Sequence, residues 1–339
     1  MASSYSNYHP VDEILTSLVS EAVPSDSQLI ASQVFETVKI PQRSGTLLVE
    51  NTRNFMGSPD LDTQRAPGAS RALIGSFDRT SLTYKAETHG LADKIAMEEI
   101  ADSQYPGSEE ARSARKVRRS LMLSKEKRAA DLLFNAAVFT NTDNCTNVMG
   151  GKVNAAGTDA LTGLDKVKDL VFQASHGINP DSIVLGRGVA RSLARNAEFR
   201  SYLTVGTVTN NFGMAGGGSL VLNDEAVKAI IRDVLGIPNV YIGSARRETA
   251  NPGATSAESQ IWTDDSLFCG ILKGSDAIVS KTAGVKSMPV AALNFELMAL
   301  KAGQYDSVES GICRNVWAEE MHLFKAIDAN LGYLVTACL

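Results

Sequence analysis

Residues 108–139 read SEEARSARKVRRSLMLSKEKRAADLLFNAAVF and predict one long helix. Ser108 is a suitable N-cap, and Glu109 and Glu110 lie in the first turn, where carboxylates favour the helix dipole. Apolar side chains recur with an approximate helical period, and neither Gly nor Pro interrupts the run. The pattern therefore predicts an amphipathic helix over residues 109–139.

The other side of this helix is strongly basic. Between residues 112 and 128 the sequence has eight Arg or Lys and the single acidic Glu126, a local net charge of +7, whereas the whole chain carries −5. Six of these residues are expected to form an outward basic face: Arg112, Arg115, Lys116, Arg118, Arg119 and Lys125. A clustered basic face on an otherwise acidic protein indicates contact with DNA or with an acidic neighbouring subunit. A solvated face without a partner is the alternative.

Upstream of the helix, residues 45–90 predict a long β-hairpin. Residues 46–55 look extended, and residues 56–70 contain two prolines and two glycines that would form the tip. On the return, Leu82 and Tyr84 alternate with polar residues, as in a half-buried strand. Because an isolated two-stranded hairpin is marginal in water, we expect other copies of the chain to complete it.

The remaining segments suggest two domains. Residues 1–44 look like an arm that contributes little to a core. Within residues 161–284, apolar helical faces alternate with short apolar strands, which predicts a compact α/β lobe. The strands are expected at residues 183–185 and 240–242, and one of the helices at residues 189–199. Residues 285–339 are β-rich, and a short sheet needs a helix to cover it. We therefore expect the basic helix to pack on the C-terminal strands, so that the chain leaves one domain, builds another and returns.

Composition excludes several classes of protein. With 44% hydrophobic and 21% charged residues, the chain is globular rather than disordered. Its apolar runs are too short to cross a bilayer and no signal peptide is evident, so no membrane contact is expected. The cysteines are far apart in sequence and are expected to be buried or free thiols in a reducing cytosol. They are Cys145, Cys269, Cys313 and Cys338.

Patterns that would indicate catalysis are sparse. The four histidines share no ligand spacing with cysteines or carboxylates, and no metalloprotease, hydrolase or calcium-loop motif is present. Residues 213–219 (GMAGGGS) lack the GK[ST] ending of a phosphate-binding loop, and a surface loop is expected. Asp264 and Asp265 are expected in a hairpin turn rather than at a metal. We therefore expect no enzyme activity, no cofactor and no metal.

The order of elements resembles the major capsid proteins of tailed bacteriophages, the family with the Hong Kong 97-type fold. Four short segments strengthen the resemblance, which covers nearly the whole chain. They are KAETHGLADKIAMEE at residues 85–99, NPDSIVLG at 179–186, VYIG at 240–243 and IWTDD at 261–265.

The resemblance implies an α+β capsid fold with defined parts. These are an N-terminal arm over residues 1–44, a long extended β-hairpin loop over 45–90, a peripheral domain over 91–160 and 285–339 with a long spine helix at about 109–139 on a β-sheet, and an inserted α/β axial domain over 161–284.

The resemblance also implies a function. Members of this family assemble as hexamers and pentamers into an icosahedral shell around double-stranded DNA, with the extended loop lying across a neighbouring subunit. The implied partners are copies of the chain, a portal, a decoration protein and packaged DNA, and the implied location is the virion capsid after assembly in the host cytoplasm. About 44 residues precede the loop, too few for a built-in scaffolding segment, so a separate scaffolding protein is expected.

Two alternatives stay open. An encapsulin-like compartment would share the fold, but it should lack a DNA-contacting basic stripe and should carry a cargo-binding helix at the N-terminus. A soluble α/β enzyme that uses residues 161–284 should have a defined small-molecule pocket in that lobe.

Overall fold

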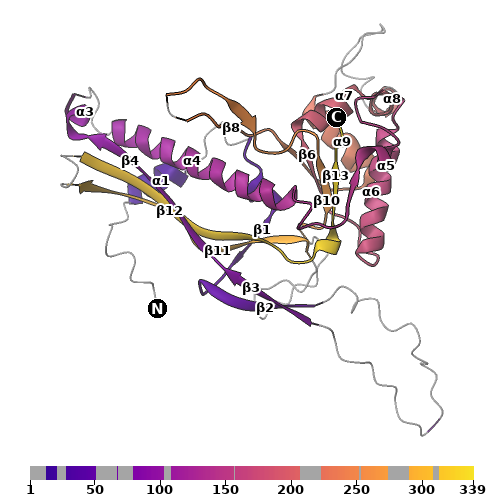
Figure 1. The fold of residues 1–339 in the computed structure, drawn as a ribbon, viewed down its shortest axis with the longest axis horizontal. Coiled ribbons are helices and arrows are strands. Elements are labelled where there is room, and N and C mark those ends of the chain that lie inside the picture. The colour runs from indigo at the N-terminus through magenta and orange to yellow at the C-terminus, as the bar shows by residue number, and fades with distance from the viewer. Residues whose placement is uncertain are drawn as a thin grey trace.

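The computed structural model of the chain describes residues 13–20, 28–50, 67, 79–102, 108–155, 157–206, 223–251, 253–273, 290–307 and 313–339. This part of the chain forms two sheets and two separate two-stranded ribbons, with helices packed on both sheets (Figure 1).

The first sheet combines strands from three distant parts of the chain. Along β12, every second residue from Val316 to Phe324 is buried, which is the period of a strand with one covered face. The outer strand of residues 36–39 pairs parallel with its neighbour, and the other two pairs of neighbouring strands are antiparallel. In spatial order the strands are β1 (Glu36–Lys39), β11 (Ala292–Ser307), β12 (Cys313–Ala326) and β4 (Glu87–Ala96).

Helix α4 (Ser108–Leu133) covers one face of the first sheet (Figure 1). Its Ala114, Val117 and Leu121 form a cluster with residues of β4, β11, β12 and the short helix α1 (Glu13–Ser20). The prediction that the basic helix packs on the C-terminal strands is therefore confirmed. The helix ends earlier than predicted, because the Asn135 side chain accepts a hydrogen bond from the Ala137 N–H at 2.9 Å and so turns the backbone.

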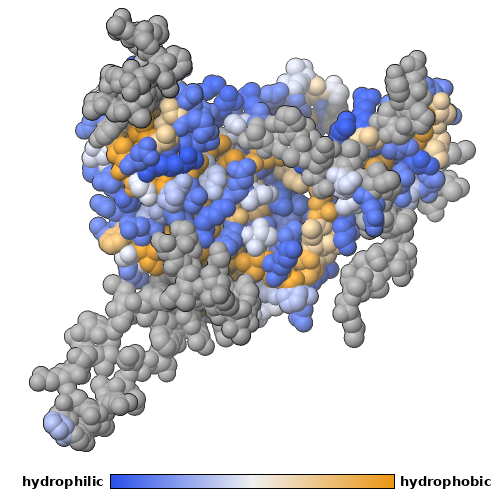
Figure 2. Space-filling view, turned by 180° about the vertical axis from the view of Figure 1, so that it is seen from behind, coloured by the Kyte–Doolittle hydropathy of each residue, from blue (hydrophilic) through white to orange (hydrophobic). Residues whose placement is uncertain are grey.

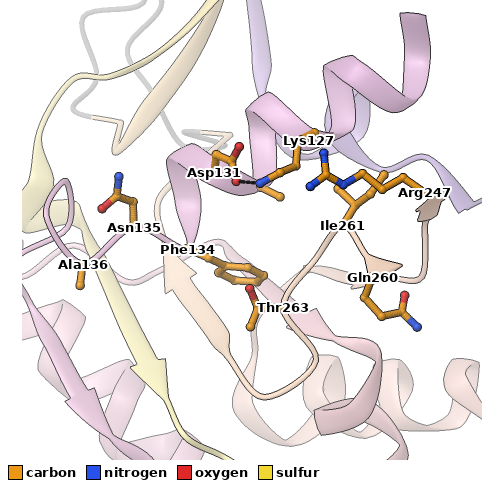
Figure 3. Close-up of a pocket in the computed structure, with 10 residues that line it drawn as sticks. Lys127, Asp131, Phe134, Asn135, Ala136, Arg247, Gln260, Ile261 and Thr263 are labelled. Atoms are coloured by element: carbon orange, nitrogen blue, oxygen red, sulfur yellow. Dashed lines mark hydrogen bonds and ion pairs between the residues drawn. The ribbon is translucent and has the colours of Figure 1, made fainter. Parts of the chain in front are cut away.

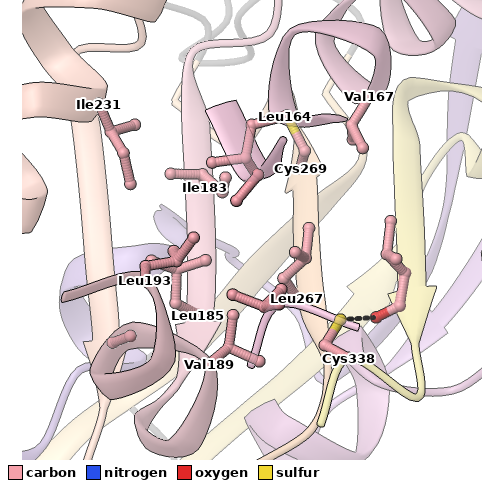
Figure 4. Packing of buried hydrophobic residues seen from close by; sticks show 14 of the residues in the cluster. Leu164, Val167, Ile183, Leu185, Val189, Leu193, Ile231, Leu267, Cys269 and Cys338 are labelled. Carbon is pink, nitrogen blue, oxygen red and sulfur yellow. Dashed lines mark hydrogen bonds between the residues drawn. The ribbon is translucent and has the colours of Figure 1, made fainter. Parts of the chain in front are cut away.

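The second sheet is buried on both sides. In β6, Ile183 and Leu185 contact the helices of the lobe (Figure 4), whereas Val184 points to the opposite side and packs in the cluster that includes the C-terminal end of α4. β7 and β10 divide their side chains between the two clusters in the same way. In spatial order the strands are β5 (Thr142–Asn144), β13 (Gly332–Thr336), β10 (Leu267–Gly270), β6 (Ser182–Gly186) and β7 (Asn239–Gly243).

Helices pack on the second sheet to form the lobe at the right of Figure 1. The Asn223 side chain caps the helix that begins at Asp224, because it accepts a hydrogen bond from the Ala226 N–H at 2.8 Å. The helix predicted after residue 188 is two helices, because the Asn196 side chain accepts from the Glu198 N–H and starts a new turn. These helices are α5 (Cys145–Met149), α6 (Ala160–Ala174), α7 (Arg187–Arg195), α8 (Ala197–Gly206) and α9 (Asp224–Leu235).

The strand pairing crosses the predicted domain limits. β5 and β13 lie outside residues 161–284, yet β13 occupies the position between β5 and β10 in the second sheet. The lobe of residues 161–284 therefore lacks two strands of its own sheet. Its predicted strands at Ile183 and Val240 are present as β6 and β7.

The N-terminal segment also differs from expectation. Ile30 and Phe35 flank the short helix α2 (Ala31–Val34) and are buried with Leu133 of α4, while β1 joins the first sheet. The expectation that residues 1–44 contribute little to a core is wrong. Elements of only a few residues carry too little periodicity to be recognised from sequence.

The predicted hairpin is confirmed at its base. β2 (Ser44–Glu50) pairs antiparallel with β3 (Arg79–Lys85), and beyond Ala86 the chain enters β4 of the first sheet. The predicted tip, residues 56–70, lies outside the described residues apart from Pro67, as does the glycine-rich segment 213–219. The other ribbon pairs β8 (Arg246–Glu248) with β9 (Glu258–Gln260), and two short helices are α3 (Met97–Asp102) and the 3-10 turn η4 (Ala329–Leu331).

Candidate assembly surfaces

The β2–β3 ribbon, which we term the extended hairpin, is fastened to the first sheet by one aromatic contact. The Tyr84 ring of β3 stacks on Phe295 of β11, with centroids 5.3 Å apart and planes 13° apart. Ile40, Ala86 and Phe295 form the small buried cluster beneath it. Aromatic stacking of this kind adds to the area that it buries. The ribbon therefore starts from a fixed base and leads away from the sheet (Figure 1).

Two hydrogen bonds between Arg43 and Ala86 fix the direction in which the ribbon leaves the first sheet. The Ala86 N–H donates to the Arg43 carbonyl at 2.7 Å, and the Arg43 Nε–H donates to the Ala86 carbonyl at 3.3 Å. Gly45 lies opposite Tyr84, and a Cβ at Gly45 would stand 2.7 Å from the tyrosine hydroxyl oxygen. A side chain at Gly45 would therefore displace the ring that anchors the ribbon.

The structure divides the six predicted basic-face residues into two groups. The side chains of Arg112 and Lys116 are 82% and 69% exposed, Arg115 is also exposed, and Arg119 is partly exposed. These four lie on the outer side of α4. The prediction that they contact DNA or a neighbouring subunit stays a prediction.

Arg118 and Lys125 lie on the inner side of the helix instead. Arg118 is 8% exposed, and the Lys125 side chain is 12% exposed and binds Glu320 of β12. The two positions are seven residues apart and flank Leu121, so they share the face that the sheet covers. Assigning them to the outer face was wrong.

Acidic residues of the same chain pair with most of the basic residues on α4. Lys116 Nζ donates to Asp93 Oδ1 at 2.8 Å, and Arg112 lies 3.7 Å from Glu109. Burial tends to raise the pKa of Asp93, but hydrogen bonds from Lys116 and Ser113 outweigh it, and the pKa is lower than the ordinary value. Lys127 pairs in turn with Asp131. The excess positive charge seen in the sequence is thus partly compensated within the fold.

A buried charged cluster joins the middle of α4 to β12. Lys125 Nζ lies 3.1 Å from Glu320 Oε2, and Arg128 Nη2 lies 3.7 Å from Glu320 Oε1. Arg128 Nη2 also lies 3.2 Å from His322 Nε2. Since a guanidinium only donates, Nε2 accepts, and the proton of the neutral ring is on Nδ1, 3.3 Å from Glu320 Oε1.

The electrostatics of this cluster keep His322 neutral. Burial, followed by the nearby charges of Lys125 and Arg128, lowers the pKa of His322 to about 2. The neighbouring His89 of β4, whose ring centroid is 4.9 Å away, also has a lowered pKa, chiefly because of burial. Sequence reasoning missed Glu320 and His322 as partners of the helix. The alternation along β12 places both on its covered face and could have indicated this.

Two pockets adjoin the β8–β9 ribbon, and the first also adjoins the end of α4. The first, of about 430 Å³, is lined by the Lys127–Asp131 pair and by Phe134, Arg247 and Thr263 (Figure 3). The second, of about 320 Å³, is lined by Arg187, Arg191, Arg246, Asp264, Gly188 and Gln260. Asp264 accepts from the Gly188 N–H at 3.1 Å. It lies in a turn, but the predicted hairpin is wrong, because β9 before it pairs with β8 and β10 after it pairs with β6 and β13. The residues that line these pockets do not pair a nucleophile with a base.

Across the described segments, no group of three or more His, Cys, Asp or Glu side chains is placed to hold a metal ion. None of the helices in this part of the chain is long and apolar enough to span a membrane.

Comparison with known proteins gives matches only at the level of structure. No protein-family model and no curated protein matches the sequence. A phage-related protein from Bordetella bronchiseptica RB50 is 16% identical with a TM-score of 0.66, over 97% of this chain and 98% of that one. The capsid of the cyanophage P-SCSP1u is 13% identical with a TM-score of 0.51, over 89% and 86% of the two chains. The chain has the Hong Kong 97-type capsid fold.

The capsid fold is also found in a virus-like particle from Pyrococcus furiosus. That protein is 7% identical, with a TM-score of 0.51 over 95% of this chain and 97% of that chain. The predicted α+β class and capsid fold are thus confirmed, whereas the assignment of the individual parts of the fold stays a prediction. At such low identity the capsid fold is shared without recognisable sequence similarity.

The outer surface of this capsid fold is mixed in character. Figure 2 shows the face opposite to that of Figure 1, on which hydrophobic residues lie in separate patches among hydrophilic ones. On the edge strand β4, Leu91 is an exposed large hydrophobic residue. An edge strand also offers unpaired backbone groups to a second chain.

Proposed function

We propose that the chain is the major capsid protein of a tailed bacteriophage. Its subunits assemble as hexamers and pentamers into an icosahedral shell that encloses double-stranded DNA. The observation that carries the proposal is the agreement of the fold with a phage capsid subunit over 89% of this chain. The protein acts by assembly and containment, and it has no catalytic turnover.

The parts of the fold take distinct roles in this proposal. Residues 1–44 act as the N-terminal arm, and residues 45–90 as the extended loop that lies across a neighbouring subunit. Residues 91–160 and 285–339 form the peripheral domain, with α4 as its spine helix, and residues 161–284 form the axial domain. The fixed base at Tyr84 and Phe295 supports this role for the loop, because a rigid base lowers the entropy lost when the loop binds.

The proposed partners follow from the same function. They are copies of the chain, a scaffolding protein, a portal, a decoration protein and packaged DNA. The exposed Arg112, Arg115 and Lys116, with the partly exposed Arg119, would contact DNA phosphates or acidic groups of a neighbouring subunit. Such contacts with DNA would be nonspecific and sensitive to salt.

Electron microscopy of the purified chain, with and without a co-expressed scaffolding protein, tests the proposal. Closed shells or isolated hexamers and pentamers are the expected result. Monomers that persist at high protein concentration, at every ionic strength tried and with the scaffold, would refute it.

An encapsulin-like compartment is the second candidate. The match to the virus-like particle from Pyrococcus furiosus favours it, since that match spans 95% of this chain. The contents of purified particles separate the two candidates. Nuclease-protected DNA is expected for the phage capsid, whereas a stoichiometric protein cargo without DNA would favour the compartment.

A further inference from the structure

Cys145 and Cys338 lie side by side although they are far apart in sequence. β5 and β13 pair in parallel, with Asn144 opposite Thr336. Cys145 directly follows β5 and begins α5, and Cys338 follows β13 after one intervening residue. Both side chains are fully buried in the same core cluster.

The two thiols lie close enough for each to shift the pKa of the other. Cys145 Sγ lies 3.4 Å from the Gly151 carbonyl oxygen. Figure 4 shows Cys338 pointing into the core, with its Sγ 3.9 Å from the Val335 carbonyl oxygen. The pKa of Cys145 is lowered, chiefly by the hydrogen bond from Cys338, and the pKa of Cys338 is raised by the same bond. Cys145 is therefore the better nucleophile of the pair.

We propose that Cys145 and Cys338 are a built-in disulfide site, which closes when the protein meets a small-molecule disulfide such as oxidised glutathione. The Cys145 thiolate attacks one sulfur of the small disulfide and releases one small thiol, leaving a mixed disulfide on Cys145. The Cys338 sulfur then attacks the Cys145 sulfur and releases the second small thiol. Two protein thiols are oxidised, one small disulfide is reduced, and the two thiol protons pass to the two leaving thiolates.

The other two cysteines, Cys269 and Cys313, lie where they do not compete for the disulfide. Cys269 lies in the centre of the second sheet, where burial raises its pKa to about 12 and keeps it a thiol. Cys313 lies in the first sheet, opposite Ser307 of β11. The disulfide is therefore specific to one pair.

Access to the buried pair requires only a local opening. The segment around Cys338 is held by two backbone hydrogen bonds, from Cys338 N to the Asp265 carbonyl at 2.8 Å and from Val153 N to the Cys338 carbonyl at 2.9 Å. Ala337 has a φ of +54°, in the left-handed region that disfavours residues with a Cβ. The strand pairs of β13 end at Thr336, so opening of this segment leaves them intact, and oxidation is expected to be slow but complete.

Once formed, the bond would join the ends of a long stretch of chain. Everything between Cys145 and Cys338, including the whole lobe, would lie within one closed loop. Such a crosslink restricts the unfolded chain strongly and so stabilises the folded one. A melting temperature higher by roughly 5 °C is expected for the oxidised protein.

The test uses the purified full-length chain, whether or not it has assembled, so its result is independent of the proposed function. After incubation with oxidised glutathione below the melting transition, thiols are counted in denaturant and disulfides are mapped by mass spectrometry. The free-thiol count is expected to fall from four to two, with a Cys145–Cys338 peptide and the higher melting temperature.

Variants separate the site from general oxidation. Cys313→Ser should lose two thiols just as the unmodified chain does, whereas Cys145→Ala should lose none to an internal bond and show no rise in melting temperature. An unchanged count of four, a disulfide to Cys269 or Cys313, or a lasting glutathione adduct on Cys145 would each overturn the proposal.

Discussion

Glu126 of α4 accepts a hydrogen bond from the indole Nε1 of Trp262 at 2.7 Å. Its other carboxylate oxygen accepts from the Ala31 N–H at 2.6 Å. One side chain thus joins the long helix, the N-terminal segment and the strand region of the lobe. Glu126 is only 2% exposed, and burial raises its pKa to about 7 although both hydrogen bonds oppose the rise.

This carboxyl group makes stability depend on pH. Its pKa is higher in the folded chain than the ordinary 4.5, so ionisation favours the unfolded chain. Its contribution to stability is therefore lost as pH rises from about 4.5 to about 7, by about 3 kcal/mol in total. Urea unfolding at steps of pH should show a flatter profile for Glu126→Gln than for the unmodified chain. Parallel profiles would contradict the assignment.

Replacing Trp262 by Phe tests the donor of the hydrogen bond to Glu126. The carboxylate would lose its indole donor, at a cost of about 2 kcal/mol when Glu126 is charged. The loss of stability should therefore be larger at pH 8 than at pH 5. A double variant with Glu126→Gln is the control, because the two effects should not add if the residues act through one hydrogen bond.

His322 gives a dependence of opposite sign. Because its pKa is lowered from 6.5 to about 2, the folded chain binds the proton far more weakly than the unfolded chain. The stability is present above pH 6.5 and is lost as pH falls, by about 1.4 kcal/mol for each pH unit. His322→Gln should lose less stability between pH 6.5 and pH 5 in the same urea experiment. Equal losses in the two proteins would show that His322 already carries its proton in the fold.

Two lysines of α4 should differ sharply when each is changed to Met. Lys125→Met leaves the buried Glu320 with the more distant Arg128 as its cationic partner and should cost about 3 kcal/mol. Lys116→Met breaks an exposed pair with Asp93 and should cost less than about 1 kcal/mol. Chemical denaturation of both variants checks this, and equal costs would place Lys125 on the outer face after all.

The exposed basic residues can be tested without disturbing the fold. Arg112→Gln combined with Arg115→Gln should leave the melting temperature unchanged, because neither side chain is buried. If they face packaged DNA, particles built from this variant should release DNA at lower salt. Lys228→Gln, which removes a partly exposed lysine on α9 that pairs with Glu225, is the control. Release at the same salt for all three proteins would exclude contact between DNA and these arginines.

Local patterns carried most of what the sequence could predict. The long helix, the base of the extended hairpin and the strand at Ile183 were predicted because each has a clear period or a recognisable cap. The inner position of Lys125 could also have been predicted, because its spacing of four residues from Leu121 places both on one helix face.

Pairing between strands that are far apart in the sequence could not be predicted from local patterns. β5 is three residues long and reads Thr-Asp-Asn, a sequence with no strand signal, and it forms because β13 offers a free edge. The short helix α2 is similar, because the Ala31 N–H gains its partner from Glu126 far along the chain. Such elements are specified by their neighbours in space rather than by their own residues.

The position of β13 between β5 and β10 also sets an order of events during synthesis. Roughly 190 residues separate β5 from β13, so at ordinary rates of translation the sheet waits about 10 to 40 s for this strand. Until residue 336 has emerged, the edges of β5 and β10 stay unpaired. Chains that end before β13 would therefore lack the central pairing of the second sheet. Such chains would not fold the lobe and could not enter an assembly of complete subunits.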